Sequence, residues 1–190
     1  MSRIRDELEV KARVLHVPAL RRALQRAGAR LAFRGAMIDR RYDRDGGLES
    51  VDQVLRLRTY RPARGKVHGV LTWKGPVGTR GAYRHRAEIE TPVPEPAAVG
   101  ALLEALGFRE TLRIDRRIES WRLGGATLRL ERYPAMDTLL EVEGSPRAIE
   151  RAVRATGLPR ERFLPESLPY FQAAYEHRTG RSAVLTRSRP

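Results

Sequence analysis

The sequence predicts an α+β domain with about eight strands, mostly antiparallel, and three or four helices. Three observations support this fold class. Short segments alternate apolar and charged residues with the period of a β-strand. Three of these segments lead into an amphipathic stretch that begins near a proline and stops at a glycine, which is typical of a helix. Short turn sequences join several strands, which favours antiparallel pairing.

The first predicted strand, DELEVKARV at residues 6–14, has one apolar face and one charged face. Two carboxylates about 7 Å apart, Glu7 and Glu9, are followed on the same face by Lys11 and Arg13. On a solvated face this pattern would carry little information. Inside a cavity it would require a cation for the carboxylates and an anion for the lysine.

A strand with the pattern Glu-x-Glu precedes a predicted helix three times. The helices are expected over residues 18–28, 96–107 and 146–157, each with an early proline and a closing glycine. The carboxylate pairs that precede them are Glu7 and Glu9, Glu88 and Glu90, and Glu141 and Glu143. A fourth helix is expected over residues 165–177, where apolar residues recur at helical spacing.

The remaining strands show the same alternation and are separated by turn sequences at residues 44–47, 74–78 and 123–126. Collected over all strands, the charged faces carry an acidic and a basic set. The acidic set is Glu7, Glu9, Glu88, Glu90, Glu131, Glu141 and Glu143. The basic set is Lys11, Arg56, Arg58, Lys74, Arg84, Arg86 and Arg117.

Two arrangements of these strands fit the pattern. An open sheet would leave the charged faces in solvent, as antiparallel sheets often do. A closed barrel would turn them inwards and cover the apolar faces with helices, and the shortage of Ser, Thr and Gln on the charged faces favours it. A charged interior must hold counter-ions. Carboxylates suit Mg²⁺ or Mn²⁺, and arginine and lysine suit phosphate, so a metal with a polyphosphate satisfies both sets.

The bulk composition fits one globular domain of 190 residues, with 41% hydrophobic and 32% charged residues. The formal charge of +14 favours anionic partners such as nucleotides, phosphates or nucleic acid. The absence of cysteine excludes disulfides and thiolate metal sites. No apolar run is long enough for a membrane helix and no signal-peptide pattern opens the chain, so a cytoplasmic location is expected. We find no phosphate-binding glycine loop, no serine-hydrolase elbow and no zinc spacing among the four histidines.

The segment ELEVK at residues 7–11 resembles the Glu-x-Glu-x-Lys signature of the CYTH domain, in the triphosphate tunnel metalloenzyme superfamily. Five further segments follow in the order of that family, so the resemblance extends from residue 4 to about residue 175. They are LRLR (55–58), LTWKGP (71–76), RAEIE (86–90), RRIESW (116–121) and LERYPAMDTLLEVEG (130–144).

The resemblance implies an eight-stranded antiparallel β-barrel, or tunnel, with a charged lumen and helices outside, over residues 1–178. A basic, poorly ordered tail is expected over residues 179–190. The implied ligands are Mg²⁺ or Mn²⁺ and a linear triphosphate. The implied metal-side carboxylates are Glu7, Glu9, Glu131, Glu141 and Glu143. The implied triphosphate-binding residues are Lys11, Arg56, Arg58, Lys74, Arg86 and Arg117. Of these two sets, Glu7, Glu9, Lys11, Lys74 and Glu143 are the implied catalytic residues.

The sequence departs from the family pattern at three places. Glu131 stands where the family often has aspartate. The segment MIDRRYD at residues 37–43 keeps only part of a Gln-x-Asp-x-Tyr-Phe-Asp pattern. Arg117 lies four residues before Trp121, one more than is usual in the family, so its role could fall to Arg116.

Three activities share this tunnel in the family: triphosphate hydrolysis, cyclisation of ATP to cyclic AMP by class IV adenylyl cyclases, and hydrolysis of thiamine triphosphate. We expect hydrolysis of inorganic, nucleoside or other organic triphosphates by a metal-activated water, because no aromatic-rich stretch indicates a base pocket. The alternatives are a cyclase and a non-catalytic module that binds polyphosphate or RNA. The expected partner is a triphosphate-bearing small molecule rather than nucleic acid or a membrane, and a homodimer is left open.

Overall fold

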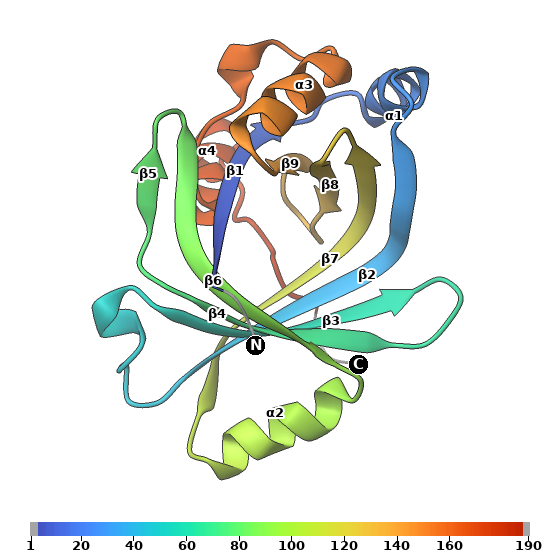
Figure 1. Ribbon diagram of the computed structural model, residues 1–190. Helices are drawn as coiled ribbons and strands as arrows, with labels where there is room; N and C mark the ends of the chain where they lie inside the picture. The colour runs from blue at the N-terminus through green and yellow to red at the C-terminus, as the bar shows by residue number, and fades with distance from the viewer. Residues whose placement is uncertain (1–3, 188–190) are drawn as a thin grey trace.

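The computed structural model describes residues 4–187, in which eight antiparallel strands close into a barrel and a ninth strand lies outside it (Figure 1). The strands are β1 (Arg5–Arg13), β2 (Arg30–Asp43), β3 (Val54–Pro62), β4 (His68–Lys74), β5 (Gly78–Arg80), β6 (Tyr83–Val93), β7 (Arg109–Leu123), β8 (Ala126–Arg132) and β9 (Leu139–Glu143). The helices are α1 (Val17–Arg26), α2 (Pro96–Ala105), α3 (Pro146–Thr156), α4 (Leu168–Thr179) and the 3₁₀ turns η1 (Glu49–Val51) and η2 (Arg160–Arg162). The prediction of an α+β fold with an eight-stranded barrel is confirmed.

Strand β1 closes the barrel. The order around the wall is β1-β9-β8-β7-β2-β3-β4-β6, and β6 pairs back with β1. Glu9 lies at the junction, opposite Arg84 of β6 and Glu143 of β9. Beyond the end of the β6 pairing, the backbone of Lys11 exchanges two hydrogen bonds of 2.8 Å with Leu164. A segment from the C-terminal part of the chain therefore completes the wall beside β1.

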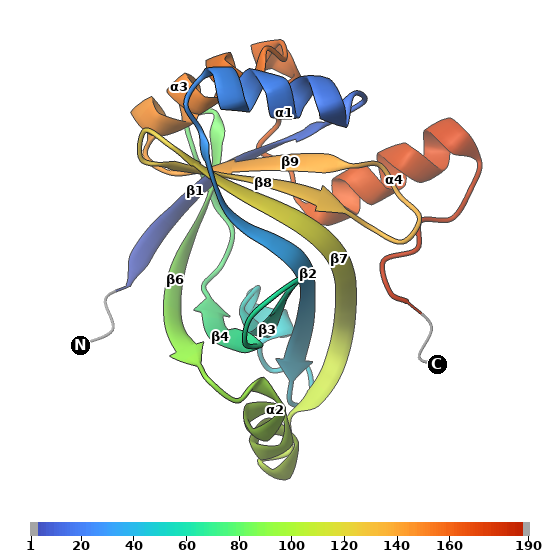
Figure 2. The same ribbon diagram turned by 90° about the vertical axis from the view of Figure 1, so that its right-hand side faces the viewer.

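The apolar core lies outside the barrel wall, beneath the helices. One cluster packs α1 and α3 against β1, β8 and β9, with Val10, Leu128, Val142 and Ile149 almost completely buried. A second cluster packs α2 against β3 through Leu57 and its neighbours. Figure 2 shows α1 and α3 across β1, β8 and β9, with α2 on the opposite side of the molecule. The outward faces of the strands are therefore apolar where a helix covers them, which leaves the charged faces for the lumen.

Helix α4 confirms the helix expected over residues 165–177, and its first residues, Leu168 and Pro169, line the lumen. It starts at Leu168 and ends before Gly180, which has the left-handed conformation (φ 66°) that commonly terminates a helix. Phe171 is buried and packs in a third apolar cluster that contains Ile114 of β7 and Leu139 of β9. Within residues 4–187, no helix has the length and apolar character needed to cross a membrane.

Residues 180–187 return along the barrel, in contrast to the poorly ordered tail expected from the sequence. Val184 exchanges two backbone hydrogen bonds with Ala135, and the carbonyl oxygen of Leu185 accepts one of 2.8 Å from the amide of Asp115. Leu185 also packs against the third apolar cluster. Unpaired backbone groups at the wall and an apolar contact therefore fix this segment despite its basic composition. The last three residues of the predicted tail, 188–190, lie outside the described part of the chain.

Replacement of Gly35 by alanine is expected to destabilise the barrel, because β2 approaches β3 closely at this point. An added Cβ would lie 2.9 Å from the Cα of Pro62 and would clash with the carbonyl oxygen of Arg61, both of which are backbone atoms. Overpacking of this kind costs about 1–3 kcal/mol. Urea unfolding of Gly35→Ala measures the loss, and Gly78→Ala is the control, because the contact nearest to its added Cβ is at 3.9 Å. Equal stability of the two variants would contradict the prediction.

Candidate active site

The lumen contains a narrow cavity of about 100 Å³ with mostly charged walls. The side-chain alternation of the strands explains this composition, since most strands turn a charged face inwards and an apolar face towards the helices, β7 being an exception. The basic side chains that line the cavity are Lys11, Arg41, Arg56, Arg58, Lys74, Arg84, Arg86, Arg116 and Arg129. The carboxylates that line it are Glu7, Glu9, Asp39 and Glu141. Cations outnumber carboxylates, so this space favours an anion with several charges.

Lys11 lies between two carboxylates on β1 and β9. Its ammonium Nζ is 2.8 Å from Glu9 Oε1 and 2.9 Å from Glu141 Oε2, and the side chain is buried. Burial alone would lower the pKa of Lys11, but Glu141 and Glu9 outweigh it and raise that pKa above its ordinary value. Lys11 is therefore a permanent positive charge inside the lumen.

Asp39 organises two arginines on the opposite wall. Its carboxylate accepts hydrogen bonds of 2.7 and 2.9 Å from Arg58 and a further one from Arg116. Arg116 also donates to Glu131 at 2.9 Å. Burial opposes ionisation of Asp39, but Arg116, Arg58 and Arg56 hold the pKa of its carboxyl well below the ordinary value. The planar guanidinium groups are thus fixed in orientation before any ligand binds.

Strands β4 and β6 supply further lining, close to a loop that contains Asp52. Lys74 pairs with Glu7 and lies 2.8 Å from Glu88. Arg86 donates to the carboxylate of Asp52, which also accepts a hydrogen bond of 2.5 Å from the amide of Val77. Asp52 has a left-handed backbone (φ 52°), which is uncommon for a residue other than glycine. Asp52 therefore connects its own loop and the loop of Val77 to Arg86 in the lumen.

A second, wider cavity of about 760 Å³ adjoins the narrow one at the mouth of the lumen. The two share part of their lining, including Arg41, Arg84 and Arg86. Asp52, Val77 and the start of α4 border the wider space. A long molecule could therefore place a highly charged end in the lumen and a bulkier end in the mouth.

Comparison with family models and with curated proteins gives no match. Solved structures do match over most of the chain. A proposed adenylate cyclase from Vibrio parahaemolyticus is 17% identical with a TM-score of 0.74, covering 91% of this chain and 99% of its own. The PH1012 protein from Pyrococcus horikoshii is 22% identical with a TM-score of 0.69, covering 87% and 98%. A proposed adenylyl cyclase from Hippeastrum, described as having a dominant triphosphatase activity, is 18% identical with a TM-score of 0.59, covering 92% and 96%.

The chain shares the closed-barrel fold of these structures. The closed barrel of eight antiparallel strands with a charged lumen agrees with these structures, and it confirms the fold that the motifs implied. At these identities the likeness establishes the fold, so the chemistry of the tunnel has to be argued from its own residues.

Most of the residues singled out in the sequence meet in the lumen of the barrel. Those that line the narrow cavity are Glu7, Glu9, Lys11, Arg56, Arg58, Lys74, Arg86 and Glu141. Glu131 lies behind this lining, 1% exposed, and accepts hydrogen bonds from Arg116 and the hydroxyl of Tyr133. Glu143 shares the inward face of β9 with Glu141 but does not line the narrow cavity. Its carboxylate is 3.8 Å from Arg129.

The expectation that Arg117 contacts the triphosphate is wrong for this tunnel. Arg117 is exposed on the outside of β7, whereas its neighbour Arg116 is buried and lines the lumen. The sequence correctly divided the residues of β7 between two faces. The error was the assumption that the face with Arg117 points into the lumen, because the face with Arg116 does so. Trp121 could have decided the direction, because it shares the face of Arg117 and packs in the apolar cluster under α1 and α3.

Asp39, Arg41, Arg116 and Arg129 line the tunnel but were not among the predicted site residues. For Asp39 the signal was the partial match of residues 37–43 to the family pattern. For Arg129 the signal was its place on the charged face of β8, opposite Glu141, to which it donates a hydrogen bond.

The carboxylates of the tunnel are engaged by basic groups. Within residues 4–187, no group of three or more acidic or histidine side chains is arranged to hold a metal ion. The carboxylates around Glu143 nevertheless have less compensating positive charge nearby. Burial, opposed by Arg129, together with repulsion from Glu7, Glu141 and Glu88, raises the pKa of Glu143 to about 7. Carboxylate oxygens are the donors that Mg²⁺ and Mn²⁺ prefer, so the donor type suits a divalent cation, although the side chains are not arranged around one in the described residues.

Replacement of Asp39 by asparagine is expected to lower the unfolding free energy by about 3 kcal/mol or more, because removal of one partner leaves buried charges uncompensated. Arg58 and Arg116 would lose their shared carboxylate. The lowered pKa of Asp39 makes this contribution complete at neutral pH, and it is lost in acid as the pH falls through the folded-state pKa. Denaturant unfolding at neutral and acidic pH measures both effects.

The control for this experiment is Asp45→Asn, an exposed loop position that also has a positive φ of 56°. Asparagine tolerates this backbone conformation well, so the control variant should match the parent at both pH values. If Asp39→Asn behaves like Asp45→Asn, the cluster does not stabilise the barrel.

Proposed function

We propose that this chain is a divalent-metal-dependent hydrolase of triphosphate compounds. The observation that carries the proposal is the lining of the narrow cavity, where nine basic side chains and four carboxylates surround a space of about 100 Å³. A linear triphosphate supplies the closely spaced negative charges that such a lining would compensate.

The arginines and lysines have different roles in this proposal. Arg58 and Arg116, held by Asp39, present planar groups that can donate paired hydrogen bonds to phosphate oxygens. Lys11 and Lys74 are compact charges, each already between two carboxylates. Fixed cations around a small space position the phosphates and stabilise charge that develops during phosphoryl transfer.

The entry of a triphosphate would also rearrange the carboxylates. Its oxygens compete with Glu9 for Lys11 and with Glu7 for Lys74, so these carboxylates become available to a cation. Glu7, Glu9 and Glu143, with Glu141 beside them, are the residues that would hold Mg²⁺ or Mn²⁺. When bound, the cation would neutralise phosphate charge and lower the pKa of a coordinated water.

Two further observations bear on the substrate. The Hippeastrum protein with a similar fold is described as having a dominant triphosphatase activity, which supports hydrolysis. The wide cavity of about 760 Å³ at the mouth has room for an organic group attached to the triphosphate. The same room makes adenylyl cyclase the second candidate, in which the ribose hydroxyl of ATP would replace water as the nucleophile.

The products distinguish the two candidates. We expect release of orthophosphate from inorganic triphosphate or from an organic triphosphate such as ATP or thiamine triphosphate, with Mg²⁺ or Mn²⁺ present, and no release after chelation with EDTA. Chromatographic separation of orthophosphate, pyrophosphate and cyclic AMP is the measurement. Pyrophosphate with cyclic AMP from ATP would identify a cyclase, and intact substrates under all conditions would exclude both activities.

Substitutions at Glu9 and Lys11 separate the metal-side role from the phosphate-side role. Glu9→Gln keeps the shape of the side chain but removes its charge, so hydrolysis should fall at least 100-fold, about 2.7 kcal/mol of barrier. Triphosphate binding without metal, measured by calorimetry, should persist in this variant. Lys11→Ala should weaken triphosphate binding itself, and more strongly at low salt because screening is then reduced.

The matched controls are Glu161→Gln and Lys66→Ala, both at exposed positions. They should leave hydrolysis and binding within about threefold of the parent, well under 1 kcal/mol. If the variants at Glu9 and Lys11 also stay within this range, the tunnel lining does not carry the activity.

A further inference from the structure

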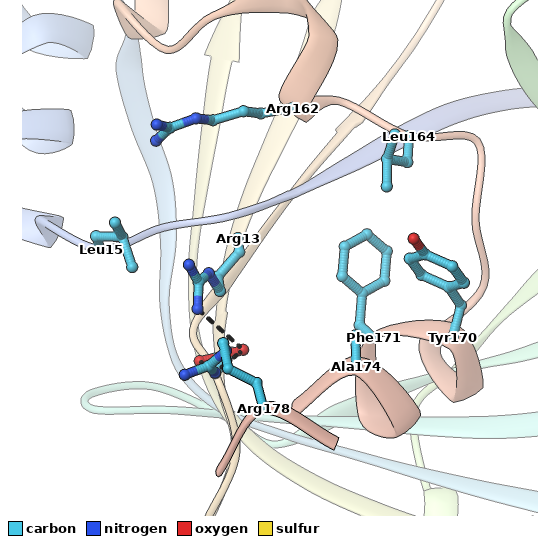
Figure 3. A pocket seen from close by; sticks show the side chains of 9 residues that line it. Arg13, Leu15, Arg162, Leu164, Tyr170, Phe171, Ala174 and Arg178 are labelled. Atoms are coloured by element: carbon cyan, nitrogen blue, oxygen red, sulfur yellow. Dashed lines mark hydrogen bonds and ion pairs between the residues drawn. The ribbon is translucent and has the colours of Figure 1, made fainter. Parts of the chain in front are cut away.

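Helix α4 lies between the tunnel and a third cavity, on the outer surface of the protein. Leu168 and Pro169, at the start of the helix, line the narrow tunnel cavity. The other side of α4, with Tyr170, Phe171 and Ala174, borders an outer groove of about 360 Å³ (Figure 3). Among the described residues, the two cavities have no lining residue in common. The outer groove is therefore a separate space rather than a branch of the tunnel.

One side of the groove is apolar. Phe171 is almost completely buried, and Leu164 and Ala174 lie beside it. Tyr170 is 48% exposed at the edge of this side, whereas Leu15, which is 56% exposed, lies on the opposite side beyond Arg13 (Figure 3). Large apolar side chains that stay exposed around a concave surface are typical of sites that receive an apolar group.

The other side of the groove is cationic. Figure 3 shows Arg162, Arg13 and Arg178 on the side away from Tyr170 and Phe171. A single carboxylate, Asp137, lines the groove with them. It accepts two hydrogen bonds of 2.7 Å from Arg178 and lies 4.0 Å from Arg13. Arg162 has no acidic partner within residues 4–187.

Arg13 belongs to the row of charged residues that begins with Glu7 on β1. Glu7, Glu9 and Lys11 line the tunnel, but Arg13 lies past its end and lines the outer groove. The proposed hydrolysis therefore does not use Arg13. Two positive charges in excess, beside an apolar surface, match a ligand that carries one anionic group on an apolar body.

We propose that this groove binds a small amphipathic anion, an aryl or alkyl group bearing a carboxylate, phosphate or similar head. The apolar body lies against Leu164, Tyr170 and Phe171, and the head lies between Arg13 and Arg162. The volume of the groove is in the range of small-molecule sites, which favours such a ligand over a docked helix or a second copy of the chain.

The test uses 8-anilinonaphthalene-1-sulfonate, an aryl sulfonate whose fluorescence rises in apolar surroundings, as the probe with the full chain. We expect saturable binding to one site, displaced by phenyl phosphate or octanoate and not by inorganic triphosphate. The uncharged analogue N-phenyl-1-naphthylamine should bind at least tenfold more weakly. Phenyl phosphate and benzoate, which share an aryl body, distinguish a phosphate head from a carboxylate head when compared as competitors.

Variants on α4 and η2 locate the site. Ala174→Trp fills the groove and should weaken probe binding at least tenfold, whereas Ala173→Trp, at the neighbouring exposed position of the same helix, should leave it unchanged. Arg162→Ala should also weaken it at least tenfold, and this substitution at an exposed side chain keeps the test valid if Ala174→Trp does not fold. Thermal melts identify folded variants.

Three outcomes would overturn the proposal. The first is the absence of saturable probe binding. The second is displacement of the probe by inorganic triphosphate, which would place it in the tunnel. The third is a dimer in sedimentation experiments that dissociates in Ala174→Trp, which would assign the groove to a second copy of the chain.

Discussion

The architecture depends on charge compensation inside the barrel. Each strand contributes charged side chains to the lumen, and neighbouring strands contribute partners of opposite sign. Glu141 of β9 shows the pattern, since it lies between Lys11 of β1 and Arg129 of β8, and both interactions hold its pKa well below the ordinary value despite burial. Without such pairs the buried charges would cost several kcal/mol each, and the strands would have no reason to turn these faces inwards.

The same pairs connect stability with the proposed function. A buried ion pair contributes little net stability compared with a well-packed apolar contact, although removal of one partner is costly. The tunnel therefore gives up stability that an apolar interior would provide, and the protein places its apolar contacts outside the wall, under α1, α3 and α2. The ion pairs of the lumen allow ligand binding, because a phosphate can replace a carboxylate beside a basic side chain and a cation can replace a basic side chain beside a carboxylate.

The sequence predicted the strand faces well because the alternation of residues is a local property. It predicted one shared cavity for Glu7, Lys11, Arg58, Lys74 and Glu143, and all of these except Glu143 line the narrow cavity. The sequence did not predict which face of a strand points into the lumen, or contacts between residues far apart in the chain. Alternation gives the period of β7 but not which face is inside, so Arg117 was chosen over Arg116. The bonds of Asp39 to two arginines and of Asp52 to Arg86 join residues 19–77 positions apart, and no local pattern contains them. The packing of residues 180–187 on β7 is non-local in the same sense.

Strand β1 has a consequence for how the chain reaches its fold. It precedes the other described strands in the chain, yet its partners are residues 84–88 of β6 and 139–143 of β9. Hairpins such as β3–β4 and β7–β8 form from neighbouring residues, whereas this seam cannot form until residue 143 has been synthesised. Contacts between such distant positions make folding slow, and an unpaired edge exposed meanwhile is open to pairing with other chains. Charged side chains on an edge strand reduce such pairing. The charged face of β1 therefore has this second role before the barrel closes.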